Sequence, residues 1–190
     1  FSNVGPVNGA VEVTDGETTN TGVFGGTTSV SGGTLNNDGG TLTGAVDITG
    51  GAVTNSGTFA DTTTVTDGSL NNDGGTLTGA VTVGADGELT TSGIVTGTLT
   101  NAGTTTVTDG SVADLENAGN ATVSGGVVAD LDNSGSGDLT IGSGGTVTTL
   151  TNAGTASNAG DVGTLSNTGG IFTNTGNVTG TSSVTGGALD

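Results

Sequence analysis

The chain has no lysine, arginine or histidine, whereas 18 of its 190 residues are aspartate or glutamate, so its formal net charge is −18. Proteins recognise the phosphate backbone of nucleic acids mainly through lysine and arginine. The composition therefore excludes ordinary nucleic-acid binding and disfavours anionic membrane surfaces. It also excludes every salt bridge between side chains of the chain itself.

Cysteine is absent as well, which excludes disulfides, thiolate metal sites and a cysteine nucleophile. Without histidine, lysine or tyrosine, only carboxylates and hydroxyls remain for acid–base chemistry. The four phenylalanines give no aromatic platform for gripping a sugar. We therefore expect no enzyme and no cofactor, and a carboxylate glycosidase is the most remote of the functions considered.

No apolar run is long enough to span a bilayer, so we expect no direct membrane insertion. No basic segment precedes a short apolar one, so any secretion signal is expected outside these residues. The chain starts abruptly at Phe1 and ends at Asp190 without a polar capping segment. We therefore expect it to be a fragment of a longer repeat array. The composition alone would also permit disorder.

An internal repeat argues against disorder. Residues 32–48 read GGTLNNDGGTLTGAVDI, and residues 67–83 read DGSLNNDGGTLTGAVTV, with a looser copy at 50–65. One unit is 17 or 18 residues, which is too short for a domain but suits one rung of a β-solenoid, where each rung buries its apolar face on its neighbours. The prediction is an all-β parallel β-helix over residues 1–190, as one domain with rungs of about 15–19 residues.

The tripeptide N-x-G marks the rungs, with an apolar residue two positions before most of the asparagines, which is strand spacing. A second alternating run follows, and the turn markers VTDG or VSGG close the rung. By the asparagine spacing, the rungs are regular over about 13–93 and irregular over 94–187, with a truncated unit near 94–101. The last forty residues look degenerate.

Aligning the rungs predicts how the interior packs. The second run begins at Phe24, Leu42, Phe59 and Leu77 in four successive rungs. Stacked in register, these form a column of alternating large and smaller side chains that fills a narrow core without overpacking. We expect this buried column to be flanked by Val30, Ile48, Val65 and Val83.

Two repeated polar features have a structural and a functional interpretation each. The asparagine row could bind a ligand, but asparagine also tolerates the left-handed conformation of turns and stacks its amides into ladders; we favour structure. Three threonine runs could form a flat, ice-binding hydroxyl array, but threonine is also an ordinary strand residue. The runs are Thr62–Thr64, Thr104–Thr106 and Thr41-x-Thr43.

One acidic cluster is a candidate metal site. Residues 112–117 (VADLEN) and 128–133 (VADLDN) are copies 16 residues apart, so their leucines point inward together. Four carboxylates then point outward as a two-by-two patch, and four carboxylates suit a hard cation such as Ca²⁺. The alternative is a solvated acidic face. The patch consists of Asp114, Glu116, Asp130 and Asp132.

The motifs L-x-N-x-G-T and V-T-x-G-G resemble those of repeat passengers of bacterial autotransporter and haemagglutinin-type adhesins. They stand at Leu35–Thr41, Val53–Thr58, Leu70–Thr76 and Leu99–Thr104. The resemblance implies a right-handed parallel β-helix, secreted by a Gram-negative bacterium and displayed outside the cell. Because the rungs are short, a flatter two-sheet solenoid is an alternative to a three-sheet cross-section. No catalytic residue carries over.

The sequence thus favours a structural or adhesive cell-surface segment, a rigid extracellular spacer or fibre subunit. Its expected partners are further copies joined end to end, through the unpaired strands of terminal rungs, or other cell-surface components. The alternative function is recognition of ice or a glycan through a lateral threonine-rich face.

Overall fold

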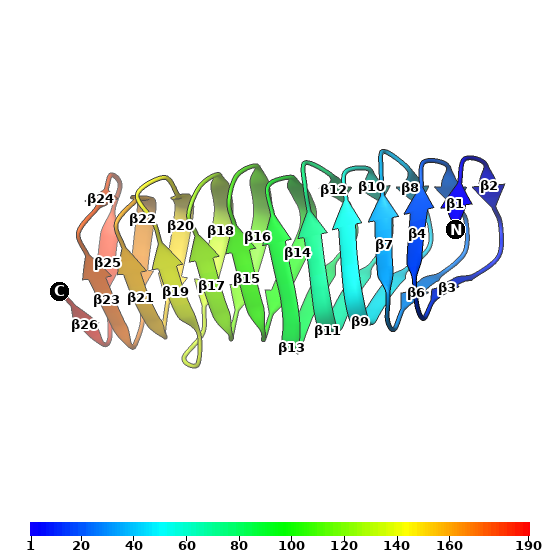
Figure 1. Ribbon diagram of the computed structural model, residues 1–190. Helices are drawn as coiled ribbons and strands as arrows, with labels where there is room; N and C mark the ends of the chain where they lie inside the picture. Colours follow the sequence, from blue (N-terminus) through cyan, green and yellow to red (C-terminus); the bar gives the residue numbers. More distant parts are fainter.

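The computed structural model describes residues 1–190 and confirms the predicted fold, a parallel β-solenoid of about 11 turns without any helix. All strand pairings are parallel and join each turn to the next. In Figure 1 the foreground strands ascend, the return strands descend behind them, and the chain advances from right to left, which is a right-handed coil. Consequently no helix of the structure could cross a membrane.

Each turn has three strand segments, so the solenoid has three walls rather than the two of the flatter alternative. Wall A begins with β1 (Ser2–Asn3), β4 (Glu17–Asn20) and β7 (Thr34–Asn37). It continues with the second halves of β9 (Val46–Asn55), β11 (Thr63–Asn72) and β13 (Val81–Thr91). It ends with β15 (Thr104–Val107), β17 (Asn120–Val123), β19 (Asp138–Ile141), β21 (Thr155–Asn158), β23 (Ile171–Asn174) and β26 (Ala188–Leu189).

Wall B follows wall A in each turn. It contains β2 (Pro6–Val7), β5 (Val23–Phe24), β8 (Thr41–Leu42), β10 (Thr58–Phe59), β12 (Thr76–Leu77) and β24 (Asn177–Val178). Between β12 and β24 it is formed by the first halves of β14 (Ile94–Asn101), β16 (Ser111–Asn117), β18 (Val127–Asn133), β20 (Thr146–Asn152) and β22 (Asp161–Asn167).

Wall C closes each turn. It contains β3 (Val11–Val13), β6 (Thr28–Val30), the first halves of β9, β11 and β13, the second halves of β14, β16, β18, β20 and β22, and β25 (Ser182–Val184). We number the turns by their wall C strand, at which each turn ends. Equivalent positions in successive turns are between 15 residues (Asn152 to Asn167) and 19 residues (Asn133 to Asn152) apart. This range agrees with the predicted rung length.

The core is one continuous apolar cluster of 32 buried side chains along the axis. Leu42 stands in register between Phe24 and Phe59, and Leu77 follows Phe59, so the predicted column is confirmed. All four side chains are buried, as are the flanking Val30, Ile48, Val65 and Val83. Beyond Leu77 the same column continues with valines, from Val95 onward.

Glycine is required at the corners because successive turns come very close there. A Cβ atom on Gly57, the glycine of one N-x-G corner, would collide with the carbonyl of Gly40 in the preceding turn. At the other corner Gly33 has a φ of 66°, a left-handed conformation that favours glycine. The asparagines do not share it, since no residue other than glycine has a positive φ. Our expectation of left-handed asparagines was therefore wrong.

The N-x-G corner changes position along the solenoid, which the sequence spacing did not reveal. From Asn3 to Asn72 the asparagines end wall A strands. Asn101, however, stands in register with Val83 at the end of wall C, while Val107 follows Thr91 on wall A. The short step from Thr91 to Asn101 is thus a change of corner, and no turn is truncated at 94–101.

The same exchange explains the apparently degenerate end of the chain. Asn152 and Asn167 end wall C strands, whereas Asn158 and Asn174 end wall A strands. The last forty residues therefore contain two interleaved asparagine columns with ordinary turn lengths, 15 residues in one and 16 in the other. The turn markers exchange corners in the same way, because Gly33 follows wall C and Gly110 follows wall A.

Candidate functional site

The asparagine side chains form buried hydrogen-bonded ladders between turns. Asn37 is typical: its Oδ1 accepts from Nδ2 of Asn20 at 2.8 Å, and its own Nδ2 donates to Oδ1 of Asn55 at 2.7 Å and to the Gly40 carbonyl at 2.9 Å. The side chain is 1% exposed. These amide groups are hydrogen-bonded within the protein, which confirms the structural interpretation of the asparagine row.

The predicted acidic patch lies on the outer side of wall C. Asp114 stands in register with Asp130, and Glu116 with Asp132, between inward-facing leucines. Threonines of the preceding turn bind the first two carboxylates: Thr98 Oγ1 donates to Asp114 at 2.9 Å, and Thr100 Oγ1 donates to Glu116 at 3.2 Å. The two-by-two arrangement is therefore as the sequence predicted.

The patch consists of two pairs on a flat strand surface rather than an enclosing cage. In neighbouring parallel strands, residues in register lie about 4.8 Å apart, while residues two apart along a strand lie about 6.6 Å apart. No group of three or more acidic side chains in the structure converges as a metal site requires. Calcium binding at the patch stays a prediction.

That prediction has a direct test by thermal melting. If the four carboxylates hold Ca²⁺, adding calcium should raise the melting temperature and chelation should lower it, because a ligand that binds only the folded state stabilises that state. The Asp130→Asn variant should lose the response. Asp47→Asn removes one exposed wall C carboxylate away from the patch and should keep it. Identical melts with and without chelator would leave a solvated acidic face.

Two open hollows lie on the surface, and each runs beside an asparagine ladder. The first, of about 460 Å³, lies beside Asn37 at the corner between walls A and B, with Asp38 and Asp73 in its lining. The second, of about 420 Å³, lies beside Asn117 and Asn133 at the corner between walls C and A. Because the ladder changes corner, the hollow beside it changes corner too.

The second hollow borders the acidic patch. Glu116 and Asp132 form part of its lining together with Thr100 and Thr151, and small side chains of Ala118 and Ala153 lie beside them. Neither hollow was predicted from the sequence. The residues before and after each ladder asparagine form them, so the N-x-G pattern contained the signal only once the corners were assigned.

Serines separate the aspartates along the first hollow. The position after the ladder asparagine reads Asp38, Ser56, Asp73 and Ser92 in successive turns. Ser56 Oγ accepts from the Gly39 amide at 3.2 Å, and Ser92 Oγ accepts from the Gly74 amide at 3.0 Å. Hydroxyls thus stand between carboxylates that would repel one another if they were adjacent.

The three threonine runs lie on three different walls and do not form one array. Thr41-x-Thr43 begins on wall B, Thr62–Thr64 runs onto wall C, and Thr104–Thr106 is on wall A. The middle residues Thr63 and Thr105 face the core, and their hydroxyls have no hydrogen-bond partner. The runs chosen from the sequence therefore do not make a common ice-binding face.

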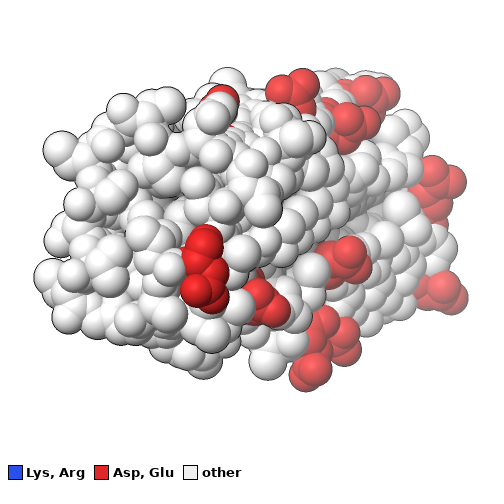
Figure 2. All heavy atoms as spheres, turned by 90° about the vertical axis from the view of Figure 1, so that its left-hand side faces the viewer, with Lys and Arg blue, Asp and Glu red and all other residues white.

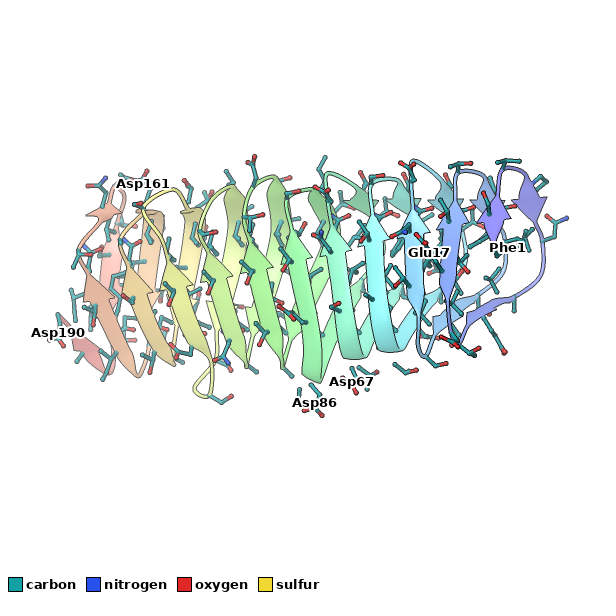
Figure 3. The ribbon with its side chains drawn as sticks, in the orientation of Figure 1. Phe1, Glu17, Asp67, Asp86, Asp161 and Asp190 are labelled. Carbon is teal, nitrogen blue, oxygen red and sulfur yellow. The ribbon has the colours of Figure 1, made fainter.

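Carboxylates are distributed over the surface of a chain that has no cationic side chain. Figure 2, viewed toward the C-terminal end, shows separate acidic groups along the visible flanks and no lysine or arginine. At the lower edge in Figure 3, Asp67 and Asp86 lie side by side, in agreement with their pairing in register. Repulsion between such neighbours is offset only by solvent and salt.

The fold and its surface define the chain as a β-solenoid repeat protein. No family model, curated protein or solved structure matches it. The likeness to adhesin passengers consequently rests on the repeat motifs alone.

Proposed function

We propose that the chain is a structural or adhesive segment of a bacterial cell-surface protein, acting as a rigid extracellular spacer or fibre subunit. The observation that carries the proposal is the unbroken stack itself. One core runs through the solenoid, and hydrogen-bonded strands join every turn to the next along all its length (Figure 1). No flexible linker interrupts the strands, so the segment holds its two ends at a fixed distance.

Rigidity follows from how each turn is held. A bend would separate neighbouring turns on one side, where it would break strand hydrogen bonds and open the core to water. The chain makes 133 backbone hydrogen bonds, and most of those outside regular strands also connect successive turns, as from the Asp38 amide to the Asn20 carbonyl. With a rise of about 4.8 Å per turn, 11 turns give a rod about 50 Å long.

Assembly along the axis is the expected mode of self-association. Wherever such a stack ends, its last turn presents unpaired backbone groups to which another stack can add. The uncompensated carboxylates oppose this, because they repel one another and the repulsion is screened only beyond about 8 Å at physiological salt. Association of the 190-residue chain should therefore strengthen with added salt and with falling pH.

Light scattering and negative-stain imaging test this expectation at low and physiological salt, each at pH 4 and pH 7. Filaments one solenoid wide should appear first at physiological salt and pH 4. Isolated rods about 50 Å long under every condition would refute axial assembly and leave the spacer role. Compact particles without a long axis would refute the spacer role as well.

Display at the cell surface needs its own measurement. Antibodies raised against the chain should label intact producing cells without permeabilisation, and external protease should remove the label. Labelling only after permeabilisation would contradict an extracellular role, whatever the shape of the protein.

Recognition of ice or a glycan by a lateral face is the second candidate. Wall C favours it, because outward hydroxyl pairs stand on several turns on either side of the acidic patch. These are Thr98 and Thr100 before it, then Thr149 and Thr151, then Thr164 and Ser166. Inhibition of ice recrystallisation or retention on a glycan array, lost on replacing Thr149 and Thr151 by lysine, would support it; no activity in either assay would exclude it.

A further inference from the structure

The amide ladders form a relay in which each neighbouring pair of turns shares a side-chain hydrogen bond. Ten such bonds connect turns 1 to 11, each 2.7–3.1 Å long. They run from Asn3 to Asn20, Asn37, Asn55, Asn72 and Thr91, then from Asn101 to Asn117, Asn133, Asn152 and Asn167, and finally from Asn158 to Asn174.

Turn 6, residues 84–101, is where the relay changes corner. On wall A its Thr91 Oγ1 accepts the last bond of the first ladder, from Asn72 at 3.1 Å. On wall C its Asn101 donates the first bond of the second ladder, to Asn117 at 2.7 Å. Oδ1 of Asn101 is buried without a partner, because Val83 stands before it. Turn 6 thus matches a different partner on each side.

Turn 10, residues 153–167, performs the reverse exchange. Its Asn167 accepts from Asn152 at 2.8 Å and ends the second ladder, while its Asn158 begins the third by donating to Asn174 at 2.8 Å. The freed amide of Asn167 donates instead to the backbone carbonyls of Gly186 and Ala188, each at 3.1 Å. A single turn with asparagines at both corners therefore keeps a side-chain amide bond to each neighbouring turn.

Turns on the two sides of turn 6 are not interchangeable. If turn 7 stacked directly on turn 5, Val107 would cover Asn72, and Asn117 would cover Val83. Asn72 would lose its Thr91 acceptor and face the apolar side chain of Val107, which costs free energy in a dry core. On wall C, Asn117 would only take the place of Asn101 above Val83, with the same unpaired Oδ1. The apolar contacts would remain of the same kind, because Val112 would cover Leu77 as Val95 does now.

We propose that turn 6 is an adaptor that joins two incompatible kinds of turn and thereby fixes the register of the whole stack. Such a device has a clear use here, because residues 32–48 and 67–83 are near copies and could exchange places during folding. Within the first five turns a slip of two turns preserves each amide pairing. A slip that removes turn 6 from the stack breaks the amide pairing. The pairing at turn 6 therefore favours the correct register of the two halves.

Paired deletions test the adaptor. Removing residues 49–83 deletes turns 4 and 5 and places Thr91 over Asn37 and Val95 over Leu42, which keeps the native kinds of contact. Removing residues 84–101 deletes turn 6 alone and breaks the relay. Although the first deletion removes 35 residues and the second only 18, we expect the second variant to melt roughly 3–6 °C below the first, because one buried acceptor is lost.

A rescue separates the relay from any other effect of the missing turn. In the variant lacking residues 84–101, Val107 takes the place of Thr91 above Asn72. Val107→Thr should therefore return a hydroxyl acceptor to Asn72 and recover at least half of the lost melting temperature. Val123→Thr makes the same change one turn later on wall A, out of reach of Asn72, and should not rescue. Equal melting of the two deletion variants, or equal effects of the two substitutions, would overturn the proposal.

Discussion

Replacing Phe59 by alanine is expected to lower the free energy of unfolding by about 3–5 kcal/mol, as large-to-small changes in tight cores do. The Phe59 ring is fully buried and lies between Leu42 and Leu77 of the neighbouring turns. Because these strands are tied to both neighbours, the walls cannot collapse to fill the space. Urea denaturation followed by circular dichroism measures the loss.

Phe1→Ala is the matched control, because it makes the same chemical change at a ring that is 71% exposed. Its effect should stay within about 0.5 kcal/mol, as for surface substitutions generally. Similar losses at the two positions, or a loss under 1 kcal/mol at Phe59, would show that the alternating column does not support the core.

Asn37→Asp should be comparably damaging, although it changes a single side-chain group. The amide of Asn37 donates to two acceptors, Oδ1 of Asn55 and the Gly40 carbonyl. A carboxylate would instead present negative charge to both, in a position that is 1% exposed and in a chain without cationic side chains. Leaving a buried charge uncompensated costs about 3–5 kcal/mol.

Asn71→Asp controls for the added charge. Asn71 is exposed on wall A, beside the ladder residue Asn72, and its neighbours in register are Thr54 and Thr90. We expect less than about 0.5 kcal/mol there. Equal denaturation midpoints for the two variants would mean that the ladder asparagines are not the buried amides described above.

The sequence predicted those features that depend on local period and on near-identical copies. The Phe24–Leu42–Phe59–Leu77 column followed from alternation along each strand and a constant offset between turns. The acidic patch followed in the same way from two copies 16 residues apart. In both cases only one sequence offset between adjacent turns places their apolar residues in register, so the sequence determined the strand register.

The change of corner was missed for a physical reason. Asparagine and valine both occupy the last inward position of a strand, and the corners after walls A and C are both closed by glycine, so the two halves of a turn are nearly equivalent. The signal lay in the order of the two: Val30 follows Asn20 by ten residues, whereas Val107 follows Asn101 by six. A constant asparagine column was assumed, and the shorter step then looked like a truncated unit.

The threonine runs could not be placed for a related reason. Thr62–Thr64 and Thr104–Thr106 look alike in sequence, but their walls depend on how the residues between them are divided into turns. That division requires the corner assignment. The hollows beside the ladders depend on it too, since they form where the residues before and after an asparagine diverge.

Distances between spin labels test the central claim, a regular parallel stack, most directly. The chain has no cysteine, so introduced cysteines are the only labelled positions. Thr19 and Thr122 lie on wall A six steps apart in register, and Thr19 and Thr173 nine steps apart. At about 4.8 Å per step, the pairs Thr19→Cys/Thr122→Cys and Thr19→Cys/Thr173→Cys should give narrow distributions near 29 Å and 43 Å. Broad distributions, or distances that do not grow in the ratio of six to nine, would contradict the solenoid.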